Sequence, residues 1–157
     1  MIELSKKIII FIITALCFFS IYWTHSYLFK TEQNTLIIAS FGASGVLAFS
    51  EQKGTQSFIK MFTSSVIAAF LGVFFNQLDI AVILKITLAI STCILIINLF
   101  NINYPPAGAI SIIPMISNSE IKALGYTFIA YPTLTGLIII YSFSLLKNKI
   151  NTTYYGK

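Results

Sequence analysis

Apolar runs separated by short polar segments make up most of the chain. Four runs are long enough to cross a bilayer, because a spanning helix needs about 20 apolar residues. Two further runs have only 14 residues each and would reach about 21 Å as helices, against a hydrocarbon core of about 30 Å. The four long runs are Ile8–Phe29, Lys60–Leu78, Ile80–Phe100 and Ile121–Leu146, and the two short runs are Leu36–Phe49 and Tyr104–Ser117. The pattern predicts an all-α, polytopic transmembrane helical bundle.

The order of the runs repeats, because a long, a short and a long run are followed by another long, short and long run. The division falls near Asp79, so we expect half-repeats at about 1–78 and 79–150 within a single transmembrane domain, 1–157. The two short runs share a chemistry of small and helix-interrupting residues, Ala-Ser-Phe-Gly-Ala-Ser-Gly over 39–45 and Pro-Pro-Ala-Gly-Ala-Ile-Ser over 105–111. Paired, interrupted short segments in the two halves are typical of transporter substrate sites.

Close helix packing is the alternative explanation for the small residues. For Ser40 with Ser44, and for Ala68 with Gly72, packing alone is the favoured interpretation. For the two short segments taken together, a binding site is favoured, since they recur at matching positions.

The proline pair predicts where the second short helix begins. Proline disfavours helix in the residue before it, so Tyr104 and Pro105 should be extended or in a turn, with a helix from about Pro106. Backbone N–H groups at helix starts near 41–42 and 106–108 would then face an anion. The candidate substrate-binding residues are Ser40, Phe41, Gly42, Ala43, Ser44, Asn103, Tyr104, Pro105, Pro106, Ala107 and Gly108.

All ten basic residues are lysines, and they flank the apolar runs of a chain that is 57% hydrophobic. This is the pattern of membrane topology, so nucleic acid is not an expected partner. Six crossings from a cytoplasmic N-terminus place seven lysines inside and only Lys30, Lys85 and Lys122 outside. Re-entrant short segments would instead move Lys53 and Lys60 outside. The lysine bias therefore favours six crossings, an inverted three-plus-three repeat, and a bacterial cytoplasmic membrane with both termini in the cytoplasm.

Groups for acid–base or metal chemistry are scarce. The carboxylates lie in predicted loops or at helix ends without forming pairs, and Cys17 and Cys93 lie in separate apolar runs without a metal-binding spacing. We therefore expect no enzyme activity, no metal and no cofactor. The single histidine, His25, follows Trp23 and is expected in an aromatic belt at the membrane surface.

Three other features modify the picture of the helices. Lys85 lies inside an apolar run but near its start, so its ammonium should reach the interface. Pro132 should bend the last long helix. Asn98, Asn101 and Asn103 cluster before the proline pair, where a water-lined cavity would supply hydrogen-bond partners.

The motif Tyr-Pro-Pro-Ala-Gly-Ala over 104–109, with Ala-Ser-Phe-Gly-Ala-Ser over 39–44 upstream, resembles the HPP family of small integral membrane proteins. The resemblance covers about Leu36 to Leu146. It implies a site at these two motifs, and some relatives are implicated in nitrite transport across chloroplast and cyanobacterial membranes. This chain has Tyr104 where the family has the histidine of its name. Tyrosine keeps a hydrogen-bonding ring but carries no positive charge near neutral pH.

The expected function is a small-solute membrane transporter or channel-like facilitator, for a small inorganic anion such as nitrite. The alternative is a non-transporting membrane assembly or sensory module whose small-residue faces pack against another protein. The expected partners are the lipid bilayer and the anion. The small size of the chain also leaves a homo-oligomer open as the unit that encloses a pore.

Overall fold

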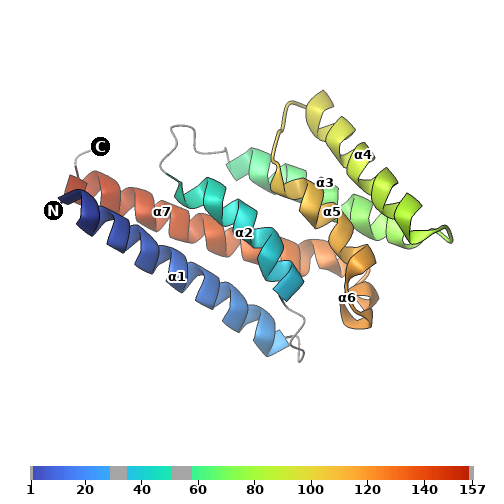
Figure 1. Ribbon diagram of the computed structural model, residues 1–157, viewed down its shortest axis with the longest axis horizontal. Helices are drawn as coiled ribbons and strands as arrows, with labels where there is room; N and C mark the ends of the chain where they lie inside the picture. The colour runs from blue at the N-terminus through green and yellow to red at the C-terminus, as the bar shows by residue number, and fades with distance from the viewer. Residues whose placement is uncertain (1, 29–34, 51–57, 156–157) are drawn as a thin grey trace.

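The computed structural model describes residues 2–28, 35–50 and 58–155, and all regular elements within them are helical (Figure 1). In chain order they are α1 (Ile2–Leu28), α2 (Thr35–Phe49), α3 (Phe58–Asn76), α4 (Val82–Leu99), α5 (Pro106–Ile116), α6 (Ser119–Ala123), η2 (Ile129–Leu134) and α7 (Thr135–Tyr155). The all-α prediction is confirmed. Lys30 and Lys53, which the topology prediction used, lie outside the described residues.

Four helices in the described part of the chain are long and apolar enough to cross a membrane: Leu4–Tyr27, Phe58–Asn76, Val82–Leu99 and Ile129–Tyr154. The first three agree with the predicted runs to within a few residues. Large apolar side chains on α1 and α4 point away from the protein, among them Phe11, which is 72% exposed, and Leu99, which is 68% exposed. Water would make such faces costly, whereas lipid accommodates them.

The prediction of one continuous helix over Ile121–Leu146 is wrong. The short helix α6 ends at a turn in which Gly125 has φ +51°, a left-handed conformation that favours glycine. Tyr131 then leaves the helical region, with φ −139° and ψ 121°, because it precedes Pro132. The bend expected at Pro132 is therefore a break, and the last spanning segment runs on to Tyr154.

The two short runs are single helices rather than hairpins. Helix α5 begins at Pro106, as predicted, and α2 begins at Thr35, one residue before the predicted run. Their 15 and 11 residues correspond to lengths of about 22 Å and about 16 Å. Figure 1 shows them running in opposite directions through the middle of the bundle.

The helices pack in two groups of three, α1 with α2 and α7, and α3 with α4 and α5. The groups meet where α2 contacts α5. In the predicted repeat, α1, α2 and α3 correspond to α4, α5 and α7. The contact of α1 with α2 then corresponds to that of α4 with α5, the contact of α1 with α7 to that of α4 with α3, and the contact of α2 with α7 to that of α5 with α3. This correspondence agrees with an inverted repeat. The repeat itself stays a prediction, because helix pairings do not measure the symmetry of the backbones.

Small side chains on α3 allow α5 to approach closely. Ser64, Ala68 and Gly72 follow one another at intervals of four residues, so they share one face of the helix, and all three are buried. A Cβ atom on Gly72 would lie only 2.5 Å from the backbone oxygen of Ser111 on α5. The packing interpretation of Ala68 and Gly72 agrees with this contact.

Two lysines bond to carbonyl groups near helix ends. The Nζ atom of Lys85 lies 3.1 Å from the backbone oxygen of Asn76, the last residue of α3, so its ammonium does reach the end of the run. The Nζ atom of Lys147 lies 3.0 Å from the backbone oxygen of Ala48, near the end of α2, and the lysine is only 7% exposed. Lys147 thus satisfies a carbonyl group near the end of α2, besides being one of the lysines used in the topology prediction.

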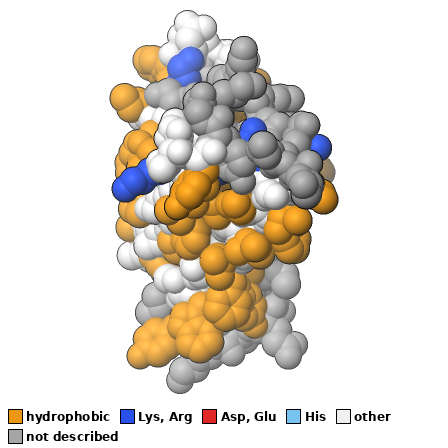
Figure 2. Space-filling model, turned by 90° about the vertical axis from the view of Figure 1, so that its left-hand side faces the viewer, with side chains coloured by type: hydrophobic (Ala, Val, Ile, Leu, Met, Phe, Trp, Pro, Cys, Tyr) orange, Lys and Arg blue, Asp and Glu red, His pale blue; other side chains and the backbone are white. Residues whose placement is uncertain are grey.

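The end of the molecule at which α1 begins and α7 ends carries several lysine side chains, with hydrophobic side chains gathered below them (Figure 2). No acidic side chain is visible among the residues that this view colours. Lysines next to apolar surface are typical of a membrane protein near a membrane boundary.

The close contact at Gly72 predicts that Gly72→Ala destabilises the protein by about 1–3 kcal/mol, because the added methyl group overpacks the α3–α5 interface. Thermal unfolding in detergent would measure the loss. Gly42→Ala is the matched control, since a Cβ atom there meets no atom within 4 Å. Equal unfolding temperatures for the two variants would contradict this account of the interface.

Candidate functional site

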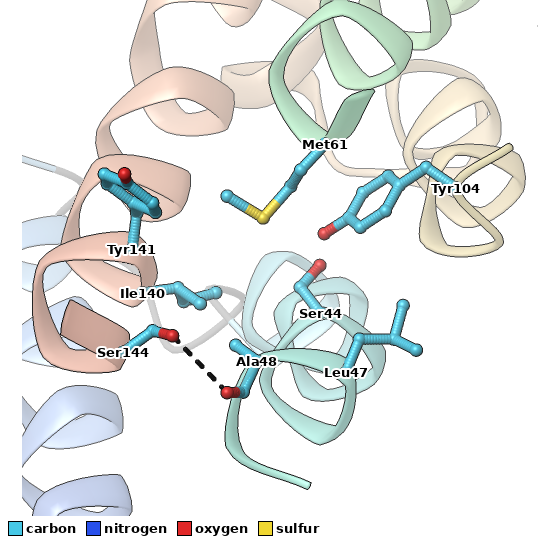
Figure 3. Close-up of a pocket in the computed structure, with 8 residues that line it drawn as sticks. All are labelled: Ser44, Leu47, Ala48, Met61, Tyr104, Ile140, Tyr141 and Ser144. Atoms are coloured by element: carbon cyan, nitrogen blue, oxygen red, sulfur yellow. Dashed lines mark hydrogen bonds between the residues drawn. The ribbon is translucent and has the colours of Figure 1, made fainter. Parts of the chain in front are cut away.

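A small cavity lies where α2, α3 and α7 meet the segment that leads into α5 (Figure 3). Its volume is about 30 Å³, which is room for about two water molecules. Eight residues line it: Ser44, Leu47, Ala48, Met61, Tyr104, Ile140, Tyr141 and Ser144. The cavity therefore joins the two short segments that the sequence singled out.

Two hydroxyl groups at this cavity have no hydrogen-bond partner beyond one another. The side chains of Ser44 and Tyr104 are 0% and 2% exposed, and their hydroxyl groups lie close enough to interact with each other. Neither hydroxyl makes a hydrogen bond of ordinary geometry to any group that the structure describes. Figure 3 shows the two hydroxyl groups next to one another and pointing toward each other. A buried hydroxyl without a partner costs about 1–3 kcal/mol. These two groups therefore suit a guest, water or a solute, that accepts hydrogen bonds from both.

The remaining wall is mostly apolar. The Ser144 hydroxyl donates to the backbone oxygen of Ala48 at 3.4 Å, and Lys147 donates to the same oxygen at 3.0 Å. No carboxylate, amine or imidazole is among the eight lining residues. The polar groups that the cavity can offer to a solute are thus neutral hydroxyls.

A second, more open groove lies on the other side of Tyr104. Its volume is about 300 Å³, and besides Tyr104 it is lined by Ile94, Ile97, Asn98, Asn103, Pro105 and Gly108. The expectation that the asparagines border a cavity is met for Asn98 and Asn103. Because Tyr104 lines both spaces, its ring separates the groove from the small cavity.

The eleven candidate residues divide into three sets. Ser44 and Tyr104 meet at the cavity, while Asn103, Pro105 and Gly108 border the groove. The remainder lie outside both spaces: Ser40, Phe41, Pro106 and Ala107 are buried among the helices, Gly42 is half-buried and Ala43 is exposed. The binding role of each residue stays a prediction.

The backbone donors expected at the two helix starts are not available. Phe41 and Gly42 lie in the second turn of α2, since that helix begins at Thr35. At the start of α5, the N–H groups of Ala107 and Gly108 already donate to the backbone oxygens of Tyr104 and Pro105, at 3.0 Å and 3.2 Å. Side-chain hydroxyls, rather than backbone N–H groups, are therefore the free donors of this site.

The placement of His25 in a surface belt is wrong. Tyr22, Trp23 and Tyr27 are at least half exposed, as a belt requires, but His25 is 0% exposed. Two residues correspond to about 200° around a helix, so His25 points away from Trp23 and into the protein. Its ring packs between those of Phe41 and Tyr131.

Sequence reasoning missed the cavity residues on α3 and α7, among them Met61, Tyr141 and Ser144. One signal for the α7 contribution was present. Gly136, Ser144 and Lys147 are spaced so that they fall on one face of an otherwise apolar helix, together with Ile140. Within the described residues, no three His, Cys, Asp or Glu side chains come together as a metal site would require.

The Ser44 and Tyr104 hydroxyls predict an unusual tolerance. Ser44→Ala and Tyr104→Phe should each lower the free energy of unfolding by no more than about 1 kcal/mol, because no hydrogen bond of ordinary geometry within the protein is lost. Ser64→Ala is the matched control, since the buried Ser64 hydroxyl donates to the backbone oxygen of Ile102 and its loss should cost about 1–3 kcal/mol. Thermal unfolding of the three variants tests this. A loss at Ser44 as large as that at Ser64 would show that the Ser44 hydroxyl is structurally bonded.

The family comparison covers nearly the whole chain. The family model described as "HPP, transmembrane region" matches residues 1–155, which include both short segments and the cavity between them. No curated protein and no solved structure matches the chain. The chain therefore belongs to the HPP family of multi-pass membrane proteins.

Proposed function

We propose that this protein is a small-solute transporter or channel-like facilitator and that its solute is a small inorganic anion such as nitrite. The observation that carries the proposal is the pair of buried hydroxyls, Ser44 and Tyr104, that line one small cavity and have no hydrogen-bond partner beyond each other. An anion that accepts a hydrogen bond from each would satisfy both groups at once. The resemblance noted from the two motifs suggests nitrite among such anions.

Neutral donors suit transport better than tight storage. A hydrogen bond to a charged group contributes about 1.5–3 kcal/mol, so two of them hold an anion without preventing its release. The cavity volume of about 30 Å³ admits a partly dehydrated small ion and excludes a larger metabolite. The site therefore favours selection by size and by hydrogen-bond acceptance.

Tyr104 supports a route into the cavity, because its ring is shared with the open groove lined by Asn98 and Asn103. In the proposed mechanism, a solute enters the groove, the Tyr104 ring rotates aside, and the hydroxyl then donates to the bound solute. Side-chain rotation is fast compared with the movement of whole helices. The helices can thus stay in place while the solute enters.

A non-transporting assembly module has less support. That alternative needs small-residue faces that remain open for another protein. On α3 this face, at Ser64, Ala68 and Gly72, is already occupied by α5 of the same chain.

Nitrite uptake into proteoliposomes tests the transport proposal. We expect flux above that of empty vesicles, and a loss of about tenfold or more in Ser44→Ala and in Tyr104→Phe, since each removes one donor to the anion. Ala43→Ser is the matched control, because Ala43 is exposed on the same turn of α2 and lines neither space. Absence of flux for nitrite, nitrate, formate and chloride would remove the proposal.

The proposed membrane is the bacterial cytoplasmic membrane, with six crossings and both termini in the cytoplasm. In a background of Cys17→Ala and Cys93→Ala, an impermeant thiol reagent should label Ser119→Cys in intact cells. It should not label Gln52→Cys or Lys149→Cys until the cells are opened. Labelling of the Gln52→Cys protein from outside would contradict six crossings.

A further inference from the structure

His25 occupies a buried site that the proposed transport mechanism does not use. It is the single histidine of the chain and is 0% exposed. Its ring lies 5.2 Å from the ring of Tyr131 and 6.0 Å from that of Phe41, centroid to centroid. An ionisable side chain within a transmembrane bundle is a candidate functional group, because burial without a purpose is costly.

Both nitrogen atoms of the His25 ring have oxygen atoms as neighbours. The Nδ1 atom lies 2.7 Å from the backbone oxygen of Ile21, one turn earlier on α1. The Nε2 atom lies 3.4 Å from the backbone oxygen of Pro132 and 3.5 Å from the Thr135 hydroxyl oxygen. That hydroxyl is itself 3.0 Å from the Pro132 oxygen.

This geometry provides partners for two protonation states. In the neutral ring, Nδ1–H donates to Ile21. The Nε2 atom can then accept from the Thr135 hydroxyl once that hydroxyl turns away from the backbone oxygen of Pro132, to which it donates in the structure. In the imidazolium ion, Nδ1–H still donates to Ile21, and Nε2–H donates to the backbone oxygen of Pro132. A proton can therefore bind and leave without stranding a buried polar group.

Among the side chains that meet at this site, His25 is the one that would gain a charge when a proton binds. The titratable side chain in contact with it is Tyr131 of η2, which is neutral near pH 7, and the neighbours from α2 and α7 are Phe41 and Thr135. The other contacts of the ring are with the backbone oxygens of Ile21 and Pro132. A proton on His25 would thus add a positive charge with no counter-ion among these neighbours.

Helix α2 connects His25 to the small cavity. Phe41 packs on the His25 ring, and Ser44, one helical turn further along α2, faces the cavity. Phe41 also packs against α7, where a Cβ atom on Gly136 would overlap its ring. Phe41, which packs on the imidazole, and Ser44, which lines the cavity, therefore lie about one turn apart on α2.

We infer that His25 is a proton-binding site whose proton accompanies the anion held by Ser44 and Tyr104. The inference rests on the proposed function. A cation on His25 and an anion in the cavity stabilise one another in a medium of low dielectric constant. By reciprocity, proton binding tightens anion binding and anion binding favours protonation of His25. Transport of one proton together with one monovalent anion carries no net charge.

Nitrogen-15 spectroscopy of histidine-labelled protein in lipid bilayers tests the inference directly, because every imidazole signal belongs to His25. We expect a neutral ring protonated at Nδ1 at high pH and a doubly protonated ring at low pH, with a single midpoint between the two forms. Saturating nitrite should raise that midpoint. A ring that stays neutral from high to low pH with and without nitrite, or a midpoint that nitrite does not move, would overturn the inference.

Two variants link the titration to transport. His25→Gln should abolish nitrite uptake driven by a pH gradient, while uptake driven by a nitrite gradient persists. Thr135→Val keeps the histidine but removes the hydroxyl that can partner the neutral ring, so the midpoint should rise. Thr24→Val is the matched control, because the Thr24 hydroxyl donates to the backbone oxygen of Ser20 at 2.8 Å instead.

The failures of the two proposals are distinguishable. Nitrite flux whose pH dependence is the same in the original protein and in His25→Gln would overturn proton coupling and leave the transport proposal intact. Absence of flux in the original protein at every pH would remove the transport proposal. The effect of nitrite on the imidazole signals would then still decide whether anion and proton binding are linked.

Discussion

A chain that crosses lipid must satisfy its backbone hydrogen-bonding groups within the protein, and the arrangement of this bundle depends on how two short helices meet that constraint. Near the end of α2, the backbone oxygen of Ala48 accepts from Lys147 and Ser144 of α7. At the start of α5, the first N–H groups turn back onto the oxygens of Tyr104 and Pro105. Side chains from α7 thus satisfy a carbonyl group near the end of α2. The first N–H groups of α5 are satisfied instead by the turn at the proline pair.

The same constraint makes the small cavity informative. The hydroxyls of Ser44 and Tyr104 have no hydrogen-bond partner there beyond one another. Alanine and phenylalanine would pack at these positions without the cost of burying a hydroxyl. The hydroxyls of Ser26, Ser65 and Ser117 are also buried without a hydrogen bond, but they do not line this cavity. The pair at Ser44 and Tyr104 is thus distinguished by its position, where the two short segments meet.

Hydropathy predicted the long helices because a lipid-facing surface is local information, readable from 20 residues at a time. It also located Pro106 as a helix start, since proline acts on its immediate neighbours. It did not predict the break between 123 and 135, because Gly125 and Pro132 lie in a run whose hydropathy continues through them. There, the backbone preferences of Gly125 and of the residue before Pro132 determined the structure, and the average hydropathy of the run did not reveal them.

The candidate site was predictable in part, for a related reason. The two motifs identified Ser44 and Tyr104, but Met61 and Ser144 belong to the site only because α3 and α7 pack against α2 and Tyr104. Nothing within a single run specifies that packing. His25 was misplaced because its aromatic neighbours in sequence face lipid, whereas its own direction around α1 faces α7.

The Tyr104 hydroxyl and the His25 imidazole lie in different parts of the bundle. Two unit charges about 4 Å apart attract by roughly 4 kcal/mol at an effective dielectric constant of 20, and the attraction halves when the distance doubles. An imidazolium at position 104 would hold an anion in direct contact, whereas the Tyr104 hydroxyl offers a neutral hydrogen bond of about 1.5–3 kcal/mol. The imidazole of His25 instead lies on α1, next to Phe41 of α2 and to Pro132 of η2. In the proposed mechanism, this separation of the donor from the charge weakens the hold on the anion and makes its binding adjustable by a proton on His25.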